Sequence, residues 1–179
     1  MIWGYIIIAL ILLPITIWSL STGIGLLLAR GVPYVPLKRK QLDVIKKNIQ
    51  LDKTDIVVDL GCGDSRVLRL FEKQGITNLT GFEINFWAYL KGFVVNSLLK
   101  SKAKMYYKNF FNENLSRYNV VFCYLLQGCL ERLKSKFDKE LRPGAIVISF
   151  AFPIKNWRDP EIIYTDSKKN LNRIFIYHI

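Results

Sequence analysis

The sequence is poor in the residues that build metal sites and disulfide frameworks. Its 179 residues include three cysteines, none of them in a C-x-x-C pair, and one histidine. Structural zinc sites and disulfide scaffolds need paired thiols or clustered histidines, so we expect neither of them and no bound metal. His178 stands in an apolar run near the carboxyl end, where we expect a strand residue, because a catalytic histidine needs a positioned partner.

Charge is absent from the first 29 residues, because every Lys, Arg, Asp and Glu lies at Arg30 or beyond. Residues 2–29 exceed the ~20 apolar residues that cross a bilayer, which predicts an amino-terminal transmembrane helix. A cleaved signal peptide is the main alternative, although the segment has no basic start and a long apolar run. A buried core helix is another. Basic residues crowd the exit of the span, so the positive-inside rule predicts a single-pass membrane protein with its domain on the cytosolic side.

The rest of the chain is long enough for one compact domain and carries a net charge of +12. We expect a membrane anchor at 1–29, a linker with a basic helix at 30–50, and a folded domain at 51–179. The positive charge fits docking on anionic lipid headgroups, which makes the bilayer an expected partner. Nucleic acid would also explain the charge, but an enzyme that acts on RNA has little reason to be tied to a membrane. The oligomeric state is left open.

Strands and helices alternate along this domain. Apolar, β-branched runs predict strands at 55–60, 78–83, 104–107, 119–124 and 144–151, and helices are expected at 38–49, 65–74, 85–100 and 128–141. Such alternation is typical of an α/β fold, a parallel sheet with helices on both faces. The end of the chain breaks the pattern, because 161–165 and 173–177 are two strand-like runs with only a polar turn between them.

The most informative pattern is a buried strand that ends in a glycine turn. The apolar run Ile56–Leu60 contains Asp59, and Gly61 and Gly63 follow it one residue apart. Glycine is needed where φ is positive or where a ligand must touch the backbone. The third glycine of a nicotinamide fingerprint is missing, so the stretch reads D-x-G-x-G-D, and Glu83 ends the next apolar run.

This pattern resembles the S-adenosyl-L-methionine site of the class I methyltransferases, whose Rossmann-like sheet has seven strands. The resemblance implies that the amino-acid end of this cofactor lies on the glycine turn and that Glu83 binds the ribose diol. It also implies that Asp59 orients the turn, with a contact through water to the cofactor's ammonium, and that the adenine needs an apolar slot and one polar group. The implied cofactor-binding residues are Asp59, Gly61, Cys62, Gly63, Asp64, Glu83, Ile84, Asn109 and Phe110.

Two positions depart from this family pattern. Ser65 stands where the family usually has a third glycine, and we expect its hydroxyl to cap the following helix. The fourth strand ends in Cys123-Tyr124-Leu125-Leu126 instead of the Asn/Asp-Pro-Pro-Tyr of enzymes that methylate adenine or glutamine amino groups. Tyr124 and Gln127 lie near the place where an acceptor amine is oriented, and they are the catalytic candidates, with packing as the alternative for each. Methyl transfer uses an electrophile that is already activated, so positioning and deprotonation of the acceptor can suffice.

A narrower resemblance is to the membrane-anchored protein-lysine methyltransferases, among them the enzymes that modify the adenine nucleotide translocase and the ATP synthase c-subunit. It is carried by Tyr34-Val35-Pro36, by the glycine turn, by Glu83-Ile84-Asn85-Phe86-Trp87, and by Phe152-Pro153 with Trp157. Tyr34 and Trp87 are the implied substrate-contacting residues. Tyr34 either folds over the opening and lines an amine channel or is an interfacial anchor.

We therefore expect a membrane-anchored methyltransferase that acts on lysine side chains of a protein. A lipid or small-molecule methyltransferase is the alternative within enzymes, because an anchor equally delivers a site to headgroups. A non-catalytic interaction protein with the same fold is the alternative outside enzymes, favoured by Ser65 and by the missing acid or base.

Overall fold

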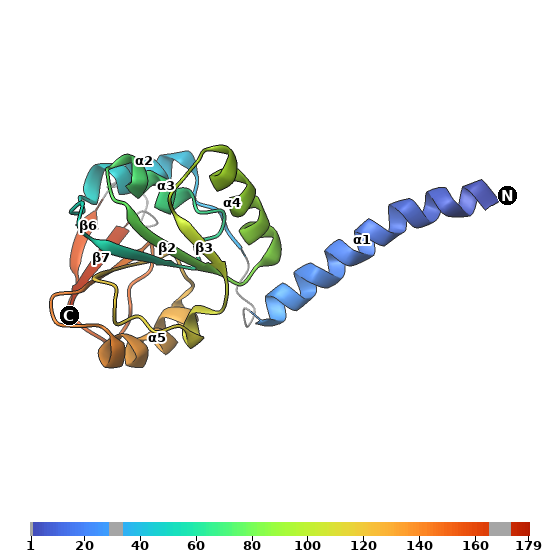
Figure 1. Cartoon of the computed structure of the whole chain (residues 1–179). Coiled ribbons are helices and arrows are strands. Elements are labelled where there is room, and N and C mark those ends of the chain that lie inside the picture. The colour runs from blue at the N-terminus through green and yellow to red at the C-terminus, as the bar shows by residue number, and fades with distance from the viewer. Residues whose placement is uncertain (1, 29–33, 165–172) are drawn as a thin grey trace.

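The computed structural model describes residues 2–28, 34–164 and 173–179 (Figure 1). Seven strands form one sheet in the order β3-β2-β1-β4-β5-β7-β6. The first five strands run parallel, β7 is antiparallel to β5, and β6 is antiparallel to β7. The strands are β1 (Ile56–Leu60), β2 (Asn78–Glu83), β3 (Lys104–Tyr107), β4 (Val120–Cys123), β5 (Ile146–Phe150), β6 (Glu161–Tyr164) and β7 (Arg173–His178).

Helices cover both faces of the sheet, as Figure 1 shows with α2, α3 and α4 on one side and α5 on the other. A short 3₁₀ turn, η1, follows β3. These elements are α1 (Ile2–Leu28), α2 (Arg39–Asn48), α3 (Arg66–Lys73), α4 (Phe86–Leu98), η1 (Phe110–Asn112) and α5 (Gln127–Glu140). The predicted α/β fold with a seven-strand sheet is confirmed, and every strand and helix predicted within the domain is present with ends shifted by at most a few residues.

Two core layers form on the two faces, because successive residues of a strand point to opposite sides of a sheet. In β1, Val57 packs in the layer that α2 and α3 complete, whereas Val58 and Leu60 pack in the layer that α5 completes. The carboxyl ends of the parallel strands β1, β2 and β4 meet at one edge, which is where open α/β sheets bind ligands.

The antiparallel end of the sheet explains the two strand-like runs near the carboxyl end. β7 pairs with β5 and β6, and His178 lies opposite Ile146 in that ladder, so the prediction that it is a strand residue is confirmed. The last residue of the predicted 161–165 run and the turn after it lie outside the described residues. So does the first part of the predicted linker, residues 30–33.

The prediction of an amino-terminal membrane anchor is wrong for the part of the chain that the structure describes. No helix within residues 2–28, 34–164 and 173–179 combines the length and the hydropathy that a bilayer crossing requires. α1 contains Pro14, and Thr16 Oγ1 donates to Leu13 O at 2.9 Å. The single-pass localisation and the cytosolic placement depended on that anchor and are corrected with it.

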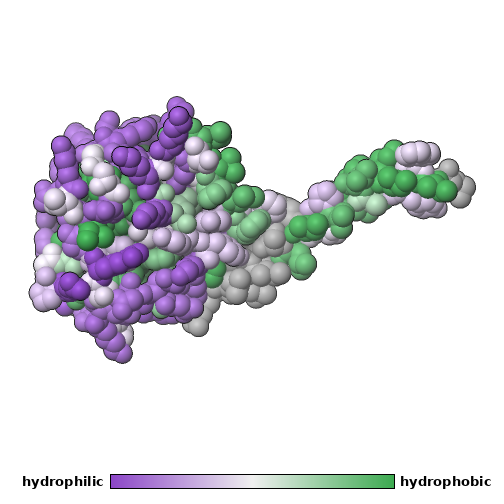
Figure 2. Space-filling view, in the orientation of Figure 1, coloured by the Kyte–Doolittle hydropathy of each residue, from purple (hydrophilic) through white to green (hydrophobic). Residues whose placement is uncertain are grey.

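Exposed apolar side chains are frequent on α1 and on α4. α1 extends away from the domain in Figure 1, on the side where α4 lies, and Figure 2 shows hydrophobic residues along α1 and hydrophilic ones over much of the visible face of the domain. On α4, Phe93 is 55 % exposed and Leu98 is 77 % exposed. On this visible face, the hydrophilic surface therefore covers the part of the domain that lies away from α1.

Candidate active site

The loop after β1 has the backbone that its glycines predict. Gly61 has φ +78° and Gly63 has φ +56°, values in the left-handed region that favours glycine. The N–H groups of Gly61 and Cys62 both donate to Phe82 O in β2, at 2.9 and 3.0 Å. The loop is thus held against the neighbouring strand by its own backbone.

Neither glycine leaves room for a side chain. A Cβ atom at Gly61 would lie 3.0 Å from Leu125 Cδ2, and one at Gly63 would lie 2.5 Å from Tyr34 Cε2. Residues from the amino-terminal segment and from the end of β4 therefore close around this loop. The cradle fits a ligand that approaches bare backbone, as the amino-acid end of S-adenosyl-L-methionine does.

Glu83 at the end of β2 links the two loops at this edge of the sheet. Its Oε2 accepts from Gly63 N at 2.8 Å, and its Oε1 accepts from Ile84 N at 2.8 Å and from Asn85 N at 2.7 Å. Burial raises the pKa of this carboxyl, and the three backbone donors oppose the rise. Because a carboxylate offers about four acceptor sites, one remains for a further donor such as a ribose hydroxyl.

Asp59 is a second buried carboxyl at the same edge of the sheet. It is 2 % exposed, and its pKa is raised well above the ordinary value by burial and then by the negative charge of Glu83. It lines a small cavity together with Gly61, Gly63 and Tyr124. Two neighbouring buried carboxyls create a site for a cation, which an α-ammonium group would supply.

Asp64 is held by cations and has a structural position. Arg66 donates to both of its oxygens, at 2.7 and 2.6 Å, and Lys91 Nζ lies 3.0 Å from its Oδ2. Burial alone would raise the pKa of Asp64, but the hydrogen bonds from Arg66 and Lys91 lower it to about 2. The carboxylate therefore fixes the loop to α3 and α4, and its oxygens are already occupied.

Ser65 takes the left-handed conformation of the glycine that it replaces, with φ +64°. It stands at the amino-terminal end of α3, but its hydroxyl does not cap that helix, so the capping prediction is wrong. Instead Ser65 Oγ accepts from Asn96 Nδ2 at 3.1 Å, and Asn96 Oδ1 accepts from Arg69 Nη1 at 2.6 Å. Arg69 also donates to Asp64 O at 2.7 Å. The Ser65 hydroxyl is therefore bound to the buried side-chain amide of Asn96 on α4 and does not accept from the backbone of α3.

The residues predicted for the adenine slot follow β2 and β3. Phe110 is 9 % exposed and packs against Phe111 with ring centroids 4.8 Å apart. Ile84 is partly buried directly after Glu83. Asn109 Oδ1 accepts from Phe111 N at 3.0 Å, so part of its capacity serves the η1 turn. An amide of this kind also has two donors and a second lone pair with which to meet a ligand.

The catalytic and substrate candidates near the end of β4 and on α4 have different surroundings. Tyr124 lines the cavity that contains Asp59, and its ring packs against Phe150 with centroids 5.6 Å apart. Gln127 Nε2 donates to Glu131 Oε1 at 2.8 Å, one helical turn along α5. Trp87 is partly buried on α4 beside Phe86. Tyr124 is thus the one of these three that borders the cavity at the glycine loop.

Cys62 offers no side chain to a ligand. Its thiol is 5 % exposed and belongs to the core layer beneath α3, and a Cβ atom at Gly81 would lie 2.6 Å from its Sγ. Burial, followed by the charges of Asp59 and Glu83, raises the pKa of this thiol well above its ordinary value. Cys62 therefore contributes its backbone to the loop and its sulfur to the core.

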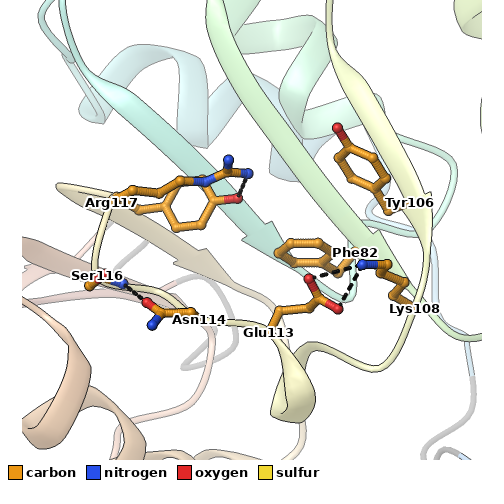
Figure 3. Close-up of a pocket in the computed structure, with 8 residues that line it drawn as sticks. Phe82, Tyr106, Lys108, Glu113, Asn114, Ser116 and Arg117 are labelled. Carbon is orange, nitrogen blue, oxygen red and sulfur yellow. Dashed lines mark hydrogen bonds and ion pairs between the residues drawn. The ribbon is translucent and has the colours of Figure 1, made fainter.

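A second pocket, of about 440 Å³, lies beside β3 (Figure 3). Phe82 and Tyr106 come from the sheet, and the loop before β4 supplies Arg117. Lys108 and Glu113 form an ion pair of 3.0 Å inside it. None of the predicted site residues lines this pocket, so the candidate active site remains at the loops after β1 and β2.

Residues 59–161 match the family model described as the ANTKMT methyltransferase domain, which is more than half of the chain. The chain belongs to this family. The family's matched region begins at Asp59 and therefore contains the glycine loop and Glu83. The predicted resemblance to class I methyltransferases is confirmed, the chain is a methyltransferase, and S-adenosyl-L-methionine is its cofactor.

The relatives of this chain include enzymes named for their action on lysine. The chain is 32 % identical to a protein-lysine N-methyltransferase of Saccharolobus islandicus (strain REY15A) over 151 residues, 83 % of this chain and 94 % of the relative. It is 30 % identical to the lysine N-methyltransferase of the ATP synthase c-subunit from Xenopus laevis over 128 residues, 70 % of this chain. It spans only 56 % of that longer relative.

The fold is also that of a solved methyltransferase structure. The RNA methyltransferase from Salinibacter ruber in complex with S-adenosyl-L-homocysteine superimposes with a TM-score of 0.71 and 23 % identity, over 81 % of this chain and 94 % of that one. At this identity the likeness concerns the fold. It is consistent with the strand order and with a ligand site at the carboxyl ends of the strands.

Sequence reasoning missed the polar residues behind the loop, Arg69, Lys91 and Asn96. They lie on α3 and α4, and Lys91 and Asn96 are far along the chain from the atoms that they bind. One signal was available, because Asn96 is a polar residue in the otherwise mainly apolar helix Phe86–Leu98 and is 7 % exposed. A buried amide needs partners, so its presence indicated a hydrogen-bonded network.

Proposed function

We propose that the chain transfers the methyl group of S-adenosyl-L-methionine to the ε-amine of lysine in a protein. The observation that carries the proposal is the match to the S. islandicus protein-lysine N-methyltransferase along 83 % of the chain and nearly the whole of that relative. The end of β4 supports it, because Tyr124 and Leu125 stand where amino-group methyltransferases of bases and glutamine carry Pro-Pro.

On the cofactor side, the proposal assigns one role to each buried carboxylate. Glu83 accepts a ribose hydroxyl at its remaining acceptor site, and Asp59 faces the α-ammonium group. Gly61 and Gly63 let the amino-acid end approach the backbone, and Ile84, Asn109 and Phe110 border the adenine. The bound cofactor supplies an activated methyl group, so these residues bind and orient and need not act as acids or bases.

On the acceptor side, the proposal needs a neutral amine held in line with the reacting bond. The lysine nitrogen attacks the methyl carbon, the carbon–sulfur bond breaks, and the nitrogen afterwards loses a proton to water. A protonated amine has no free electron pair, and the ordinary pKa of lysine is about 10.4. Tyr124 is the candidate to orient the amine, and Trp87 is the candidate to border its entry.

Quantitative mass spectrometry tests the proposal directly. Proteins from cells with and without the gene are compared, and lysine methylation that depends on this chain is the expected result. In parallel, labelled S-adenosyl-L-methionine is supplied to the purified full chain with a cell extract, and the extract is divided into protein, lipid and RNA. Label that enters lipid or RNA and not protein would overturn the lysine assignment.

The pH dependence of the reaction gives a second test. Because only the neutral amine attacks, the rate at saturating cofactor should rise about tenfold per pH unit below the amine's pKa. A protein substrate whose target lysine is replaced by arginine is the matched control and should accept no label. A rate that is flat between pH 7 and 9 would argue against an amine acceptor.

A further inference from the structure

Residues 34–37, which we call the strap, cross the glycine loop. The Tyr34 ring leaves a Cβ atom no room at Gly63. Leu37 is 4 % exposed in the core layer beneath α3, and Arg66 Nη1 donates to Leu37 O. Arg66 also holds Asp64 of the loop. One guanidinium therefore joins the strap to the glycine loop, and the position of Tyr34 is fixed from both sides.

The strap forms one wall of the small cavity at the glycine loop. Tyr34, Val35, Pro36 and Leu37 line it together with Asp59 and the glycines, and its volume is about 40 Å³. One water molecule needs roughly 10–15 Å³ measured in this way, so the cavity has room for a few waters at most. The aromatic residue of the strap therefore borders the space next to Asp59, where we place the amino-acid end of the cofactor.

The Tyr34 hydroxyl is buried, and it makes no hydrogen bond to any residue that the structure describes. A buried hydroxyl without a partner is rare and costly, which points to a ligand group as its partner. Burial, and then the charge of Asp64, raises the pKa of Tyr34 to about 12. The hydroxyl stays protonated at every physiological pH and is a donor.

Asp64 is the nearby acceptor that competes for this hydroxyl, because both its charge and its hydrogen-bonding approach raise the Tyr34 pKa, although the two groups form no hydrogen bond of normal geometry. Its carboxylate oxygens, however, already accept from Arg66 and lie 3.0 Å from the Lys91 ammonium. These two cations also offset its negative charge, so a second carboxylate can approach Tyr34 without strong repulsion. The Tyr34 hydroxyl is therefore available to a ligand.

We propose that the Tyr34 hydroxyl donates a hydrogen bond to the carboxylate of the amino-acid end of S-adenosyl-L-methionine. The amino-acid end carries one ammonium and one carboxylate. Asp59 is suited to the ammonium, and Tyr34 is a neighbouring donor that bonds to no residue the structure describes. This assigns Tyr34 to the cofactor, in place of the substrate role that the sequence predicted. The inference rests on the proposed position of the cofactor and not on the identity of the methyl acceptor.

Two ligands distinguish a hydrogen bond from Tyr34 to the cofactor carboxylate from simple packing of the Tyr34 ring on the loop. S-Adenosylhomocysteine has the amino-acid end, and 5′-methylthioadenosine keeps the adenosine and the sulfur but lacks that end. Calorimetric titration of the full chain and of its Tyr34→Phe variant should show a loss of about 10- to 100-fold for S-adenosylhomocysteine, as for a hydrogen bond to a charged group. The affinity for 5′-methylthioadenosine should stay within about twofold, since it lacks the carboxylate.

Tyr164→Phe is the matched control, because Tyr164 is 69 % exposed on β6 and loses the same hydroxyl. It should leave both affinities unchanged. Equal losses for the two ligands in Tyr34→Phe would mean that removing the hydroxyl disturbs the loop as a whole. Unchanged affinity for both would mean that only the ring matters, by packing on the loop, or that the hydroxyl has another partner. Either result overturns the proposal. Thermal melting of both variants confirms that they are folded, and neither titration requires a methyl acceptor, so the result is independent of the lysine assignment.

Discussion

The two sides of the active-site edge differ in how their polar groups are held. On the cofactor side, Glu83 and Asp64 each accept several short hydrogen bonds, some of them from groups distant in the sequence. On the acceptor side, Gln127 binds Glu131 within its own helix, and the ring of Tyr124 packs on Phe150. The cofactor side is a buried network, and the acceptor side is assembled from fewer polar contacts.

This difference follows from what each side must do. The cofactor carries fixed charges and hydroxyls, so its residues have to be rigid and of the right charge before it binds. The acceptor is an amine that needs only to be neutral and in line, and small adjustments can position it. Substitutions on the cofactor side should therefore have large effects, and those on the acceptor side small ones.

The largest effect should come from Gly63→Ala. The added Cβ meets Tyr34 at 2.5 Å on a backbone with φ +56°, so both the strap and the loop have to move. We expect calorimetry to detect no binding of S-adenosylhomocysteine, which corresponds to a loss of roughly 100-fold or more, about 3 kcal/mol. Gly144→Ala is the control, because Gly144 also has positive φ, +88°, but has no atom within 4 Å of the new Cβ. Normal binding by Gly63→Ala would show that the loop does not form the cofactor cradle.

Glu83→Gln should lower the affinity for S-adenosylhomocysteine by about 10- to 100-fold, because a charged acceptor is lost at a buried site. The wild-type affinity should also fall as the pH is lowered from about 8 to 5, since the raised pKa brings protonation of Glu83 closer to neutral pH. The variant has no carboxyl to protonate there and should show a shallower fall, with Asp59 giving the remainder. Parallel pH profiles for the two proteins would contradict the assignment of Glu83.

Asp64→Asn should affect acid stability. The folded pKa of Asp64, about 2, lies below the ordinary value of 3.8, so the ionised group stabilises the fold above about pH 4. This contribution, about 1–2 kcal/mol once solvent screening is allowed for, is lost as the pH falls toward about 2. Urea unfolding at about pH 7 and pH 3 should therefore give a smaller difference in the variant than in the wild type. The exposed Asp159→Asn serves as control and should behave as wild type.

The smallest effect should come from Gln127→Ala on the acceptor side. Its amide is already bound to Glu131, so we expect kcat to fall by less than about threefold and the affinity for the cofactor to stay the same. Steady-state kinetics with the substrate found by mass spectrometry measures both. A loss of more than about 100-fold in kcat would contradict the difference between the cofactor side and the acceptor side, because it would place an essential group on the acceptor side.

The sheet was predictable from the sequence for a physical reason. The central strands β1, β4 and β5 are short apolar runs rich in Val and Ile, and helical segments alternate with the strands along the domain, so local pattern and overall fold agree. The glycines and Glu83 could also be singled out, because a bare backbone and a carboxylate at the ends of β1 and β2 have few other uses in this topology.

Side-chain partners were less predictable. Ser65 is a residue type that often caps helices, but Asn96, 31 residues away, binds its hydroxyl. The position of Tyr34 depended on how a segment before the first strand folds back, which no local pattern specifies.

The position of Cys62 has a consequence for how the enzyme can be handled and exposed to oxidants. Thiolates react with alkylating agents and peroxides, and buried thiols with raised pKa values do so slowly. The sulfur beneath the glycine loop lies in the core against β2 and α3. Activity should therefore persist without a reducing agent and after brief treatment with iodoacetamide, although a cysteine stands in the middle of the glycine motif.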